Sequence, residues 1–548
     1  MKKNLLIVFL LLACFVLKAQ NNVNGKNESK LKGLSAITED AVRGPLEFLA
    51  SPWTEGRETG SRGGFMAADY LVSMLKVYGI APLGQFQRPS RLQDLLSTSS
   101  TRTYFQDFSL IEASQGDVQK ISISFTDGTG IRNVDLNYRT DFNFGIPEIG
   151  WDVSAPVVFV GYGIADDAKG LNELKGLNLK GKIVLRLQGV PGTNFPNSDG
   201  VNKFGTTQYL KDDFLLQRGA LAVMDVATDD EVQSWADNYP IHYKSSVYEG
   251  NTLPDNLKPK RMRIPVDTLT TLLKRVIITK RVANDILRSV GITVDGYAKD
   301  AAGLKFPLLK NMTGINANIV ASVKNHIVKA RNILGIIEGE IKDEYVVLGG
   351  HYDHLGIQNG FIYNGADDNG SGTVGILTLA KAFMATGVKP KRSIIFALWT
   401  GEEKGLLGSN YFVNNSDFKD KKIVFYLNYD MISRSAPEDT IGKSFRMIYT
   451  KAFPRFEDIT INNLKSNGID LKPNFVPMDI PRGGSDFTAF SLKNIPLMTW
   501  NAGHPLDYHQ LSDETSKTDW SKMVKMIKLG FLDVWDIVNG DGLEQKQK

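Results

Sequence analysis

Four apolar runs in the second half of the chain are each followed by residues that can bind a metal ion. The runs and the residues that follow them are 345–350 with His351, 393–399 with Glu402 and Glu403, 422–428 with Asp430, and 495–501 with His509. Runs of this length and composition are typical of strands that are buried on both faces, as in a parallel sheet. Because the carboxyl ends of parallel strands lie along one edge, these histidines and acids are expected to meet there. The pattern therefore predicts an α/β sheet with a divalent-metal site at one edge.

A glycine-rich loop supplies a further candidate ligand. The segment Asn364-Gly-Ala-Asp-Asp-Asn-Gly-Ser-Gly372 carries the acidic pair Asp367 and Asp368 between glycines. Taken alone, such a segment is more often a turn than a ligand loop, and a Glu-Glu pair is usually a solvated helix start. Their combination with histidines at the ends of apolar strands, in a chain with 6 histidines, is difficult to explain by chance. The sequence therefore predicts a metal centre.

The candidates have the number and chemistry that a two-metal site requires. Two divalent ions about 3.5–4 Å apart need roughly five side-chain ligands, one of them a bridging carboxylate. The predicted ligands are His351, Asp368, Glu403, Asp430 and His509. This mixture of carboxylates and imidazoles suits zinc, with positions left for water and substrate. We therefore predict Zn²⁺ as the cofactor, with a pair of ions in each chain.

Two acidic residues beside these ligands are expected to act without binding metal. Glu402 directly precedes Glu403, so its side chain points in another direction and can take a proton from the attacking water. Asp353 lies two residues after His351. It is expected to accept a hydrogen bond from that imidazole and to fix its orientation.

The roles of three other residues near the ligands are less defined by the sequence. Asp513, four residues after His509, could orient that histidine as Asp353 is expected to orient His351. For His354 and His504 the sequence leaves two roles open, either lining the pocket or making a structural hydrogen bond.

Other catalytic motifs do not occur. Gly442-Lys443-Ser444 resembles the end of a phosphate-binding loop, but Pro437 occupies the position of its first glycine. The sequence contains no His-Glu-x-x-His and no Gly-x-Ser-x-Gly. These observations argue against nucleotide binding, single-zinc metalloproteases and serine hydrolases of those types.

Residues 1–19 have the features of a secretory signal peptide. Lys2 and Lys3 precede an apolar segment at 5–17, which is too short to span a bilayer comfortably. Cleavage is expected after Ala19, which would give an exported protein, periplasmic or extracellular, with no membrane span. Leu11-Leu-Ala-Cys14 also resembles a lipoprotein cleavage box, so lipidation of Cys14 is the alternative.

Removal of this segment would leave a nearly neutral chain without a thiol. The 548 residues include 64 basic and 60 acidic ones; loss of Lys2, Lys3 and Lys18 leaves 61 basic residues, and the net charge falls from +4 to +1. No nucleic-acid partner follows from such a charge. Because Cys14 is the only cysteine, disulfides, cysteine catalysis and cysteine-ligated zinc are excluded from the mature chain.

Changes of pattern divide the chain into a discontinuous domain and an insert. Segments with helical spacing that alternate with the apolar runs are 64–78, 371–385, 406–412 and 520–538. Between them, from about residue 114, the sequence changes to short strand patterns such as 121–125. We predict a discontinuous α/β domain formed by 33–113 and 316–540, and an inserted module at 114–315.

Together these features resemble the family of co-catalytic dizinc aminopeptidases, which also includes glutamate carboxypeptidase and the transferrin receptor. Glu55-Gly-Arg57 with Gly60-Ser61 resembles the family's N-terminal signature, and Tyr104-Phe-Gln106 resembles the strand that follows. The insert, with Leu179-Lys-Gly-Lys-Ile-Val-Leu185, is similar to a protease-associated domain. The resemblance implies an α/β fold of the zinc-exopeptidase (phosphorylase/hydrolase-like) type, a three-layer αβα sandwich with an inserted mostly-β protease-associated domain.

The resemblance also implies a role for each candidate. His351 and Asp430 would hold one zinc ion, Glu403 and His509 the other, and Asp368 would bridge the two. Glu402 matches the general base, and Tyr508 matches a phenol that hydrogen-bonds the developing oxyanion. The element Gly484-Ser-Asp-Phe487 lacks the histidine of the family's Ser-Asp-His sequence, which leaves the specificity pocket undefined.

The expected activity is removal of N-terminal residues from peptide substrates. A site rich in carboxylates suits a free ammonium, whereas a carboxypeptidase needs arginines for the terminal carboxylate. Arg434 and Arg482 keep a carboxypeptidase of the glutamate carboxypeptidase type open as an alternative. A non-catalytic, receptor-like binding protein on the same scaffold is the alternative of another class, and it would be expected to have lost ligands.

Overall fold

The computed structural model describes residues 25, 27–86, 102–147, 149–166, 171–191, 206–237, 260–265, 273–303, 305, 309, 312–415 and 417–540. The predicted signal segment 1–19, with its cleavage site and Cys14, lies outside these residues. Within them, no helix combines the length and the apolar character that crossing a membrane requires.

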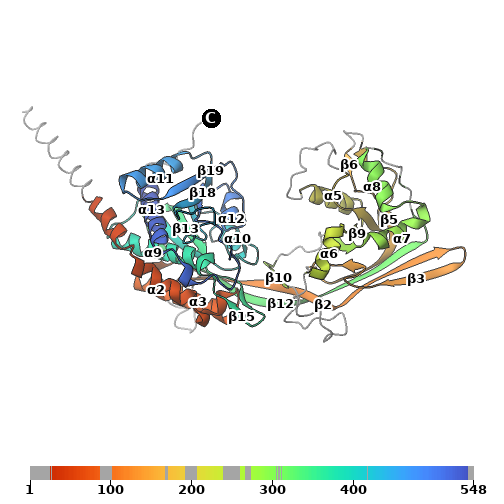
Figure 1. Ribbon diagram of the computed structural model, residues 1–548, viewed down its shortest axis with the longest axis horizontal. Helices are drawn as coiled ribbons and strands as arrows, with labels where there is room; N and C mark the ends of the chain where they lie inside the picture. The colour runs from red at the N-terminus through yellow and green to blue at the C-terminus, as the bar shows by residue number, and fades with distance from the viewer. Residues whose placement is uncertain are drawn as a thin grey trace, which may run out of the picture. The chain divides into compact units, whose positions relative to one another are not determined.

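The chain forms two compact units (Figure 1). The first comprises residues 1–110 and 328–548, and the second comprises 111–327. Both junctions fall inside long strands, β2 (Phe105–Asp127) and β12 (Ile315–Ile337). The predicted boundaries at 113/114 and 315/316 differ from those of the compact units. The strand pattern continues across each junction, so the composition does not change there.

The first unit contains both helices and strands. Its helical segments are α2 (Glu39–Leu49), η1 (Pro52–Arg57), α3 (Arg62–Val77), η6 (Ala366–Ser371), α9 (Gly372–Ala385), α10 (Leu407–Asn414), α11 (Arg455–Ser466), α12 (Phe487–Ser491), η7 (Thr515–Lys517) and α13 (Trp520–Asn539). Its strands, besides parts of β2 and β12, are β1 (Ala81–Pro82), β13 (Ile341–His351), β14 (Gly356–Gln358), β15 (Phe361–Tyr363), β16 (Arg392–Trp399), β17 (Lys422–Tyr429), β18 (Ser444–Thr450), β19 (Lys472–Met478) and β20 (Leu497–Asn501).

The predicted apolar runs form the centre of the sheet in the first unit. The strand order there is β19-β18-β20-β17-β13-β16-β12. β20, β17, β13 and β16 are parallel to one another, whereas β18 and β12 pair antiparallel with their neighbours β20 and β16. The predicted α/β sheet is therefore confirmed, and the carboxyl ends of its parallel strands lie along one edge.

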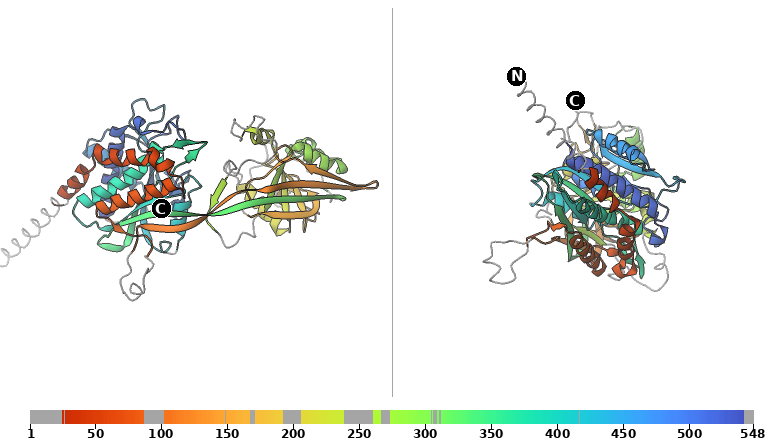
Figure 2. Two further views of the ribbon diagram at one scale, coloured as in Figure 1. Left: turned by 90° about the horizontal axis from the view of Figure 1, so that it is seen from below. Right: turned by 90° about the vertical axis from the view of Figure 1, so that its left-hand side faces the viewer.

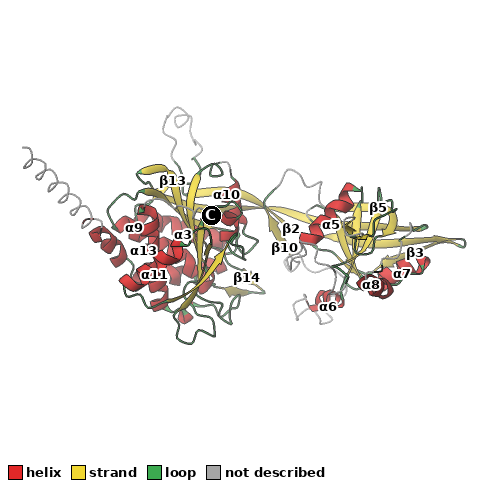
Figure 3. Ribbon diagram, turned by 90° about the horizontal axis from the view of Figure 1, so that it is seen from above, coloured by secondary structure: helices red, strands yellow, loops and turns green. Residues whose placement is uncertain are grey.

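Alternation along the central strands builds a core on each face of the sheet. On β13, Val346 and Leu348 belong to the core that includes side chains of α2, α3, α9 and α13, whereas Val347 belongs to the core with α10 and α12. Side chains of successive strand residues point to opposite faces, so the apolar stretch 346–348 contributes to both cores. Figure 2 shows the red helices α2 and α3 beside the teal helix α9, and Figure 3 shows helices on both sides of the strands. The first unit is therefore a three-layer αβα sandwich.

Local sequence signals account for the start of α3, which lies next to the site. The side chain of Ser61 accepts a hydrogen bond from the backbone N–H of Gly64 at 3.1 Å, as an N-cap does. Ala68, Leu71 and Leu75 form its buried face. This agrees with the helical spacing predicted for 64–78, and it fixes the preceding residues of η1 against the sheet.

The second unit has its own sheet and core. Its strands, besides parts of β2 and β12, are β3 (Gly130–Leu136), β4 (Phe142–Asn143), β5 (Trp151–Phe159), β6 (Ala165–Asp166), β7 (Leu171–Asn172), β8 (Ile183–Leu187), β9 (Ala222–Val226), β10 (Lys260–Arg263) and β11 (Lys274–Ile278). Its helical segments are α5 (Thr206–Gln217), α6 (Asp229–Asp237), α7 (Lys280–Leu287), η5 (Arg288–Val290) and α8 (Val294–Ala302). The strand order is β12-β5-β8-β9-β11-β4, with β5, β8, β9 and β11 parallel. The likeness of this insert to a protease-associated domain stays a prediction.

A buried carboxylate between α11 and α13 makes the stability of the first unit depend on pH. Asp533 is 0% exposed and accepts hydrogen bonds from Thr460 Oγ1 at 2.6 Å and Asn463 Nδ2 at 2.9 Å. Burial raises its pKa from 3.8 to about 7. The folded state therefore binds this proton more tightly than the unfolded state, and stability falls as the pH rises from about 4 to about 7.

We expect Asp533→Asn to remove this loss of stability, which is on the order of 3 kcal/mol above pH 7. The variant should be more stable than the wild type at about pH 8 and similar to it at about pH 4.5, as measured by thermal unfolding. Asp458→Asn, a change at an exposed residue of α11, is the control and should not show this difference. Parallel curves of melting temperature against pH for the wild type and Asp533→Asn would contradict the assignment.

Candidate metal centre and active site

The first group of candidate ligands gathers around His351, the last residue of β13. Its Nε2 atom lies 3.6 Å from Asp368 Oδ1 and 3.6 Å from Asp430 Oδ1. Asp430 directly follows β17, the parallel neighbour of β13, so both side chains leave the same edge of the sheet. The ligand atoms of these three residues all lie within 4.8 Å of one another, a separation that a single metal ion can span.

A second group meets the first at Asp368. His509 Nε2 lies 2.9 Å from Asp368 Oδ2 and 3.2 Å from Glu403 Oε2. Asp368 thus directs one oxygen toward His351 and the other toward His509. This is the arrangement that a bridging carboxylate needs.

The two adjacent glutamates after β16 face different members of the cluster. Glu402 Oε2 lies 3.8 Å from His351 Nε2, whereas Glu403 contacts His509 and His354. Burial raises the pKa of Glu402 well above its usual value, and the carboxylates of Asp430, Asp486 and Glu403 add to the shift. A buried carboxylate beside the cluster, with a raised pKa, has the property that a general base requires.

Asp353 has a different contact from the one predicted. The hydrogen-bond partner of His351 Nδ1 is the backbone carbonyl of Asp353, at 3.2 Å, and the carboxylate Oδ1 lies farther away at 3.9 Å. That carboxylate instead accepts hydrogen bonds from the backbone N–H of Glu402 at 3.2 Å and from Thr59 Oγ1 at 2.7 Å. Asp353 therefore orients His351 through its main chain and holds the backbone of Glu402 through its side chain.

The loop that carries Asp368 is tightly constrained. Gly365 has a φ of +56°, and a Cβ atom there would lie 2.3 Å from the carbonyl oxygen of Asp368 and 2.4 Å from the His354 ring. Only glycine fits this close approach. The loop can therefore place Asp368 directly beneath the histidines.

Asp513 also differs from its predicted role. Its carboxylate accepts hydrogen bonds from the backbone N–H groups of Asp367, at 3.0 and 3.2 Å, and Asp368, at 3.0 Å. It also lies 3.6 Å from Arg434 Nη1. Asp513 thus holds the ligand loop rather than the imidazole of His509, because its side chain turns toward the buried backbone amides of that loop.

His354 joins the cluster, a role that the sequence left open. It is fully buried, and its Nδ1 atom lies 2.9 Å from Glu403 Oε1 and 3.8 Å from Asp368 Oδ2. Its position three residues after His351 offered no periodic signal, because the chain leaves the strand at that point. His504, in contrast, is exposed and packs edge-on against the Tyr508 ring, with 5.5 Å between ring centroids.

Tyr508 lies at the open side of the cluster. Its ring stacks on the His509 ring at 3.8 Å, and the residue is 41% exposed. Partial burial raises the pKa of the phenol, as do the nearby carboxylates of Asp368 and Glu403. The phenol therefore stays protonated and can donate a hydrogen bond to a substrate.

The electrostatics of the cluster fit a bound cation. Burial alone would lower the pKa of His509, but its contacts with Asp368 and Glu403 outweigh burial and raise the pKa to about 10. Burial also opposes the shift at His351, whose pKa is raised well above its usual value by Glu402, Asp430 and Asp368. Both shifts report an excess of buried negative charge. Carboxylate oxygens and imidazole nitrogens are the donors that zinc prefers, so the residues fit the predicted ions.

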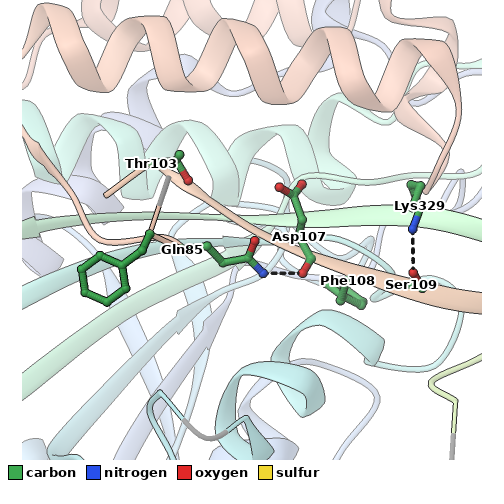
Figure 4. Close-up of a pocket in the computed structure, with 7 residues that line it drawn as sticks. Gln85, Thr103, Asp107, Phe108, Ser109 and Lys329 are labelled. Atoms are coloured by element: carbon green, nitrogen blue, oxygen red, sulfur yellow. Dashed lines mark hydrogen bonds between the residues drawn. The ribbon is translucent and has the colours of Figure 1, made fainter. Parts of the chain in front are cut away.

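A separate cavity of about 420 Å³ lies elsewhere in the first unit and has no comparable chemistry (Figure 4). Its lining includes Gln85, Asp107 and Lys329. Gln85 Nε2 donates to the backbone carbonyl of Asp107 at 2.6 Å, and Lys329 Nζ donates to Ser109 Oγ at 3.0 Å. These polar groups are paired with each other, and the cavity contains none of the candidate ligands.

Comparisons with known proteins agree with the geometry. Residues 332–531, which include all of the candidate ligands and Glu402, match the family model described as Peptidase family M28. A probable leucine aminopeptidase 2 of Arthroderma benhamiae is 30% identical over 203 residues, which is 36% of this chain and 38% of the relative. A glutamate carboxypeptidase 2 homolog of Caenorhabditis briggsae is 27% identical over 407 residues, 64% of this chain and 48% of the relative. The chain thus spans less than half the length of either curated relative.

A solved structure shows a similar fold over a longer range. The aminopeptidase from Aneurinibacillus sp. strain AM-1 has a TM-score of 0.51 and 18% identity, and the similarity covers 95% of this chain and 98% of that one. This likeness supports the arrangement of helices and strands described above.

Proposed function

We propose that this protein is a dizinc exopeptidase, most specifically an aminopeptidase, because residues 332–531 match the model of Peptidase family M28. The observation that carries the proposal is the position of Asp368, with one oxygen toward His351 and the other toward His509, and with Glu402 beside His351. This is the geometry of a two-ion hydrolytic site with an adjacent base.

The candidate ligands define how two ions would be held. His351 and Asp430 would bind one zinc ion, Glu403 and His509 would bind the other, and Asp368 would bridge them. Zinc at these positions supplies Lewis-acid polarisation of the scissile carbonyl and lowers the pKa of a bound water. His354, which contacts Glu403 at 2.9 Å, would fix the orientation of that ligand.

Glu402 carries the proton transfers in this proposal. Its carboxylate accepts a proton from the attacking water and then donates it to the nitrogen of the leaving amine, so the peptide bond is cleaved without net proton exchange. The hydrogen bond from its backbone N–H to Asp353 fixes the start of the side chain. Tyr508 would donate a hydrogen bond to the oxygen that becomes negative as the tetrahedral intermediate forms.

The pairing of Arg434 favours an aminopeptidase over a carboxypeptidase. Arg434 Nη1 lies 2.7 Å from Asp507 and 3.6 Å from Asp513, and its side chain is 14% exposed. A guanidinium that is already paired with two carboxylates is a poor site for the terminal carboxylate of a substrate. The acids around the cluster, in contrast, supply partners for a free ammonium.

We expect peptides with a free N-terminus to be cleaved at least about a hundredfold faster than the same peptides with an acetylated N-terminus, because the acetyl group removes a charge-assisted contact. A panel of aminoacyl reporter compounds, assayed with added zinc, would measure this ratio and the side-chain preference. Matched peptides with a free or an amidated C-terminus are the control. Dependence on the C-terminal carboxylate instead would favour the carboxypeptidase alternative.

Zinc analysis addresses the alternative of a non-catalytic binding protein. All of the proposed ligands are present and converge in the structure. Purified protein that holds no zinc after incubation with the ion would favour a receptor-like function.

We also propose that the protein is exported after cleavage near Ala19, on the basis of the basic and apolar pattern of its first residues. N-terminal sequencing of the mature protein tests this, and an N-terminus at Cys14 would favour the lipoprotein alternative.

A further inference from the structure

Arg57 is a fully buried arginine whose hydrogen bonds converge on the segments that carry the candidate ligands. It is the last residue of η1, and its side chain is 0% exposed. Its guanidinium donates to four backbone carbonyls, namely Tyr352 at 2.8 Å, Leu49 at 2.6 Å, Asn364 at 2.6 Å and Gly365 at 2.8 Å. Tyr352 follows His351, and the 364–365 peptide begins the loop of Asp368. One side chain therefore ties two ligand-bearing segments together.

The charge of Arg57 is balanced at a distance rather than by a direct partner. Among the described residues, no carboxylate forms an ion pair with it, and burial lowers its pKa from 12.5 to about 10, so it stays charged near neutral pH. The acids that oppose this shift are Asp513, Asp368, Asp353 and Glu403. Burial of a cation whose hydrogen-bond partners are all carbonyls costs free energy of folding, which points to a function for this residue.

Asp513 holds the same loop from its other side. The guanidinium of Arg57 takes the carbonyls of Asn364 and Gly365, whereas the carboxylate of Asp513 takes the N–H groups of Asp367 and Asp368. The backbone N–H of Ala366 also donates to the carbonyl of Asp513 at 3.2 Å. The cation and the anion thus bind opposite ends of the peptide dipoles in one short loop.

We propose that Arg57 and Asp513 are positioning residues that act as a pair, and that they preorganise Asp368 and His351 for metal binding. The proposal rests on the proposed function in that it requires the zinc centre. It adds one requirement to the fold. The affinity for zinc depends on Arg57, a residue of the N-terminal segment that contacts no side chain of a metal ligand.

A lysine cannot replace Arg57 in this role. The planar guanidinium presents its N–H groups in a fixed fork that reaches carbonyls in several directions, whereas an ammonium is a single point with donors on one atom. Arg57→Lys keeps the charge but loses the simultaneous contacts to Tyr352, Asn364 and Gly365. The variant therefore separates geometry from charge.

Arg392 provides a matched control in the same unit. It is also a buried arginine that binds backbone carbonyls, those of Ile537, Val538 and Gly540, and it pairs with Glu344. It lies at the first residue of β16, the opposite end of the strand from Glu402. Arg392→Lys should therefore lower thermal stability without touching the ligand loop.

The test is a competitive titration of the full-length wild type and variants against a chromophoric zinc chelator, together with thermal unfolding. We expect Arg57→Lys and Asp513→Asn each to weaken zinc binding at least about tenfold, with less than additive effects in the double variant. Arg392→Lys should keep the zinc affinity of the wild type at a similar loss of melting temperature.

Wild-type zinc affinity in Arg57→Lys would overturn the proposal, as would an equal loss of affinity in Arg392→Lys. If Arg57→Lys does not fold, Asp513→Asn decides, and unchanged zinc affinity in that variant overturns the proposal. Failure of the proposed function gives a different result. A wild type that binds two zinc ions but cleaves no peptide would refute the peptidase and leave the titration fully interpretable.

Discussion

Glu402→Gln is expected to bind two zinc ions as the wild type does. Its turnover rate on peptides should be lower by a factor of at least about a thousand. The amide has the shape of the carboxylate but cannot accept the proton of the attacking water. Because the backbone N–H of Glu402 makes the hydrogen bond to Asp353, that contact survives the substitution. Steady-state kinetics on a free N-terminal substrate and zinc content by elemental analysis measure the two quantities.

Glu58→Gln is the matched control for this variant. Glu58 is a part-exposed glutamate that pairs with Lys404 at 2.9 Å. Its replacement removes a carboxylate near the site without affecting the proposed proton transfer, so turnover should stay close to that of the wild type. Turnover by Glu402→Gln at the wild-type rate would remove Glu402 from the role of base, whereas loss of zinc would show that it holds metal.

The second large effect is expected for Asp368→Asn, which should lose at least one zinc ion and about a thousandfold or more of the turnover rate. An amide offers one oxygen, whereas the carboxylate directs one oxygen toward His351 and the other toward His509. Loss of the bridge should also reduce the rise in melting temperature on addition of zinc, since stabilisation by a ligand depends on its affinity. Elemental analysis and thermal unfolding with and without zinc check both results.

A substitution of the neighbouring Asp367 tests which of the two adjacent acids bridges the metal ions. Its Oδ1 accepts hydrogen bonds from the N–H and Oγ of Ser433 and from Oγ of Ser371, away from the histidines. Burial and the charge of Asp513 raise its pKa to about 7, so a neutral residue is tolerated there. Asp367→Asn should therefore keep both zinc ions. Equal zinc loss in the two variants would contradict the assignment of Asp368 as the bridge.

The central sheet could be read from the sequence because it depends on simple rules. The apolar runs that end near His351, Trp399, Asn428 and Asn501 are strands that are buried on both faces. Parallel neighbours bring their carboxyl ends to one edge. The convergence of side chains from distant segments therefore followed from strand order, without any knowledge of individual contacts.

Contacts that depend on rotamers and loop paths could not be read in this way. The carboxylate of Asp353 turns toward Thr59, which is 294 positions away in the sequence, and so it does not meet His351 as predicted. His354 reaches Glu403 from the segment that follows the end of β13 at His351. The guanidinium of Arg57 meets carbonyls about 300 residues away. Spacing along the sequence carries no information about such pairs.

The predicted limits of the insert, residues 114 and 315, both fall in the strands that cross between the compact units. The strand patterns of β2 and β12 continue across both junctions, because one strand can belong to one sheet at its start and to another at its end. The composition changes at about 114, after the first junction, and at about 315, before the second. The structural boundaries therefore reflect packing, which composition does not record.

The entry and exit of the second unit through two paired strands make the first unit separable by engineering. β2 and β12 pair with each other, and Lys329 reaches Ser109 across the pair at 3.0 Å. Chain positions 110 and 328 thus emerge from adjacent backbones, a spacing that a short hairpin turn bridges. Excision of 111–327 with such a turn would leave the first unit with all of the candidate ligands. It would also make the same point of attachment available for grafting another module.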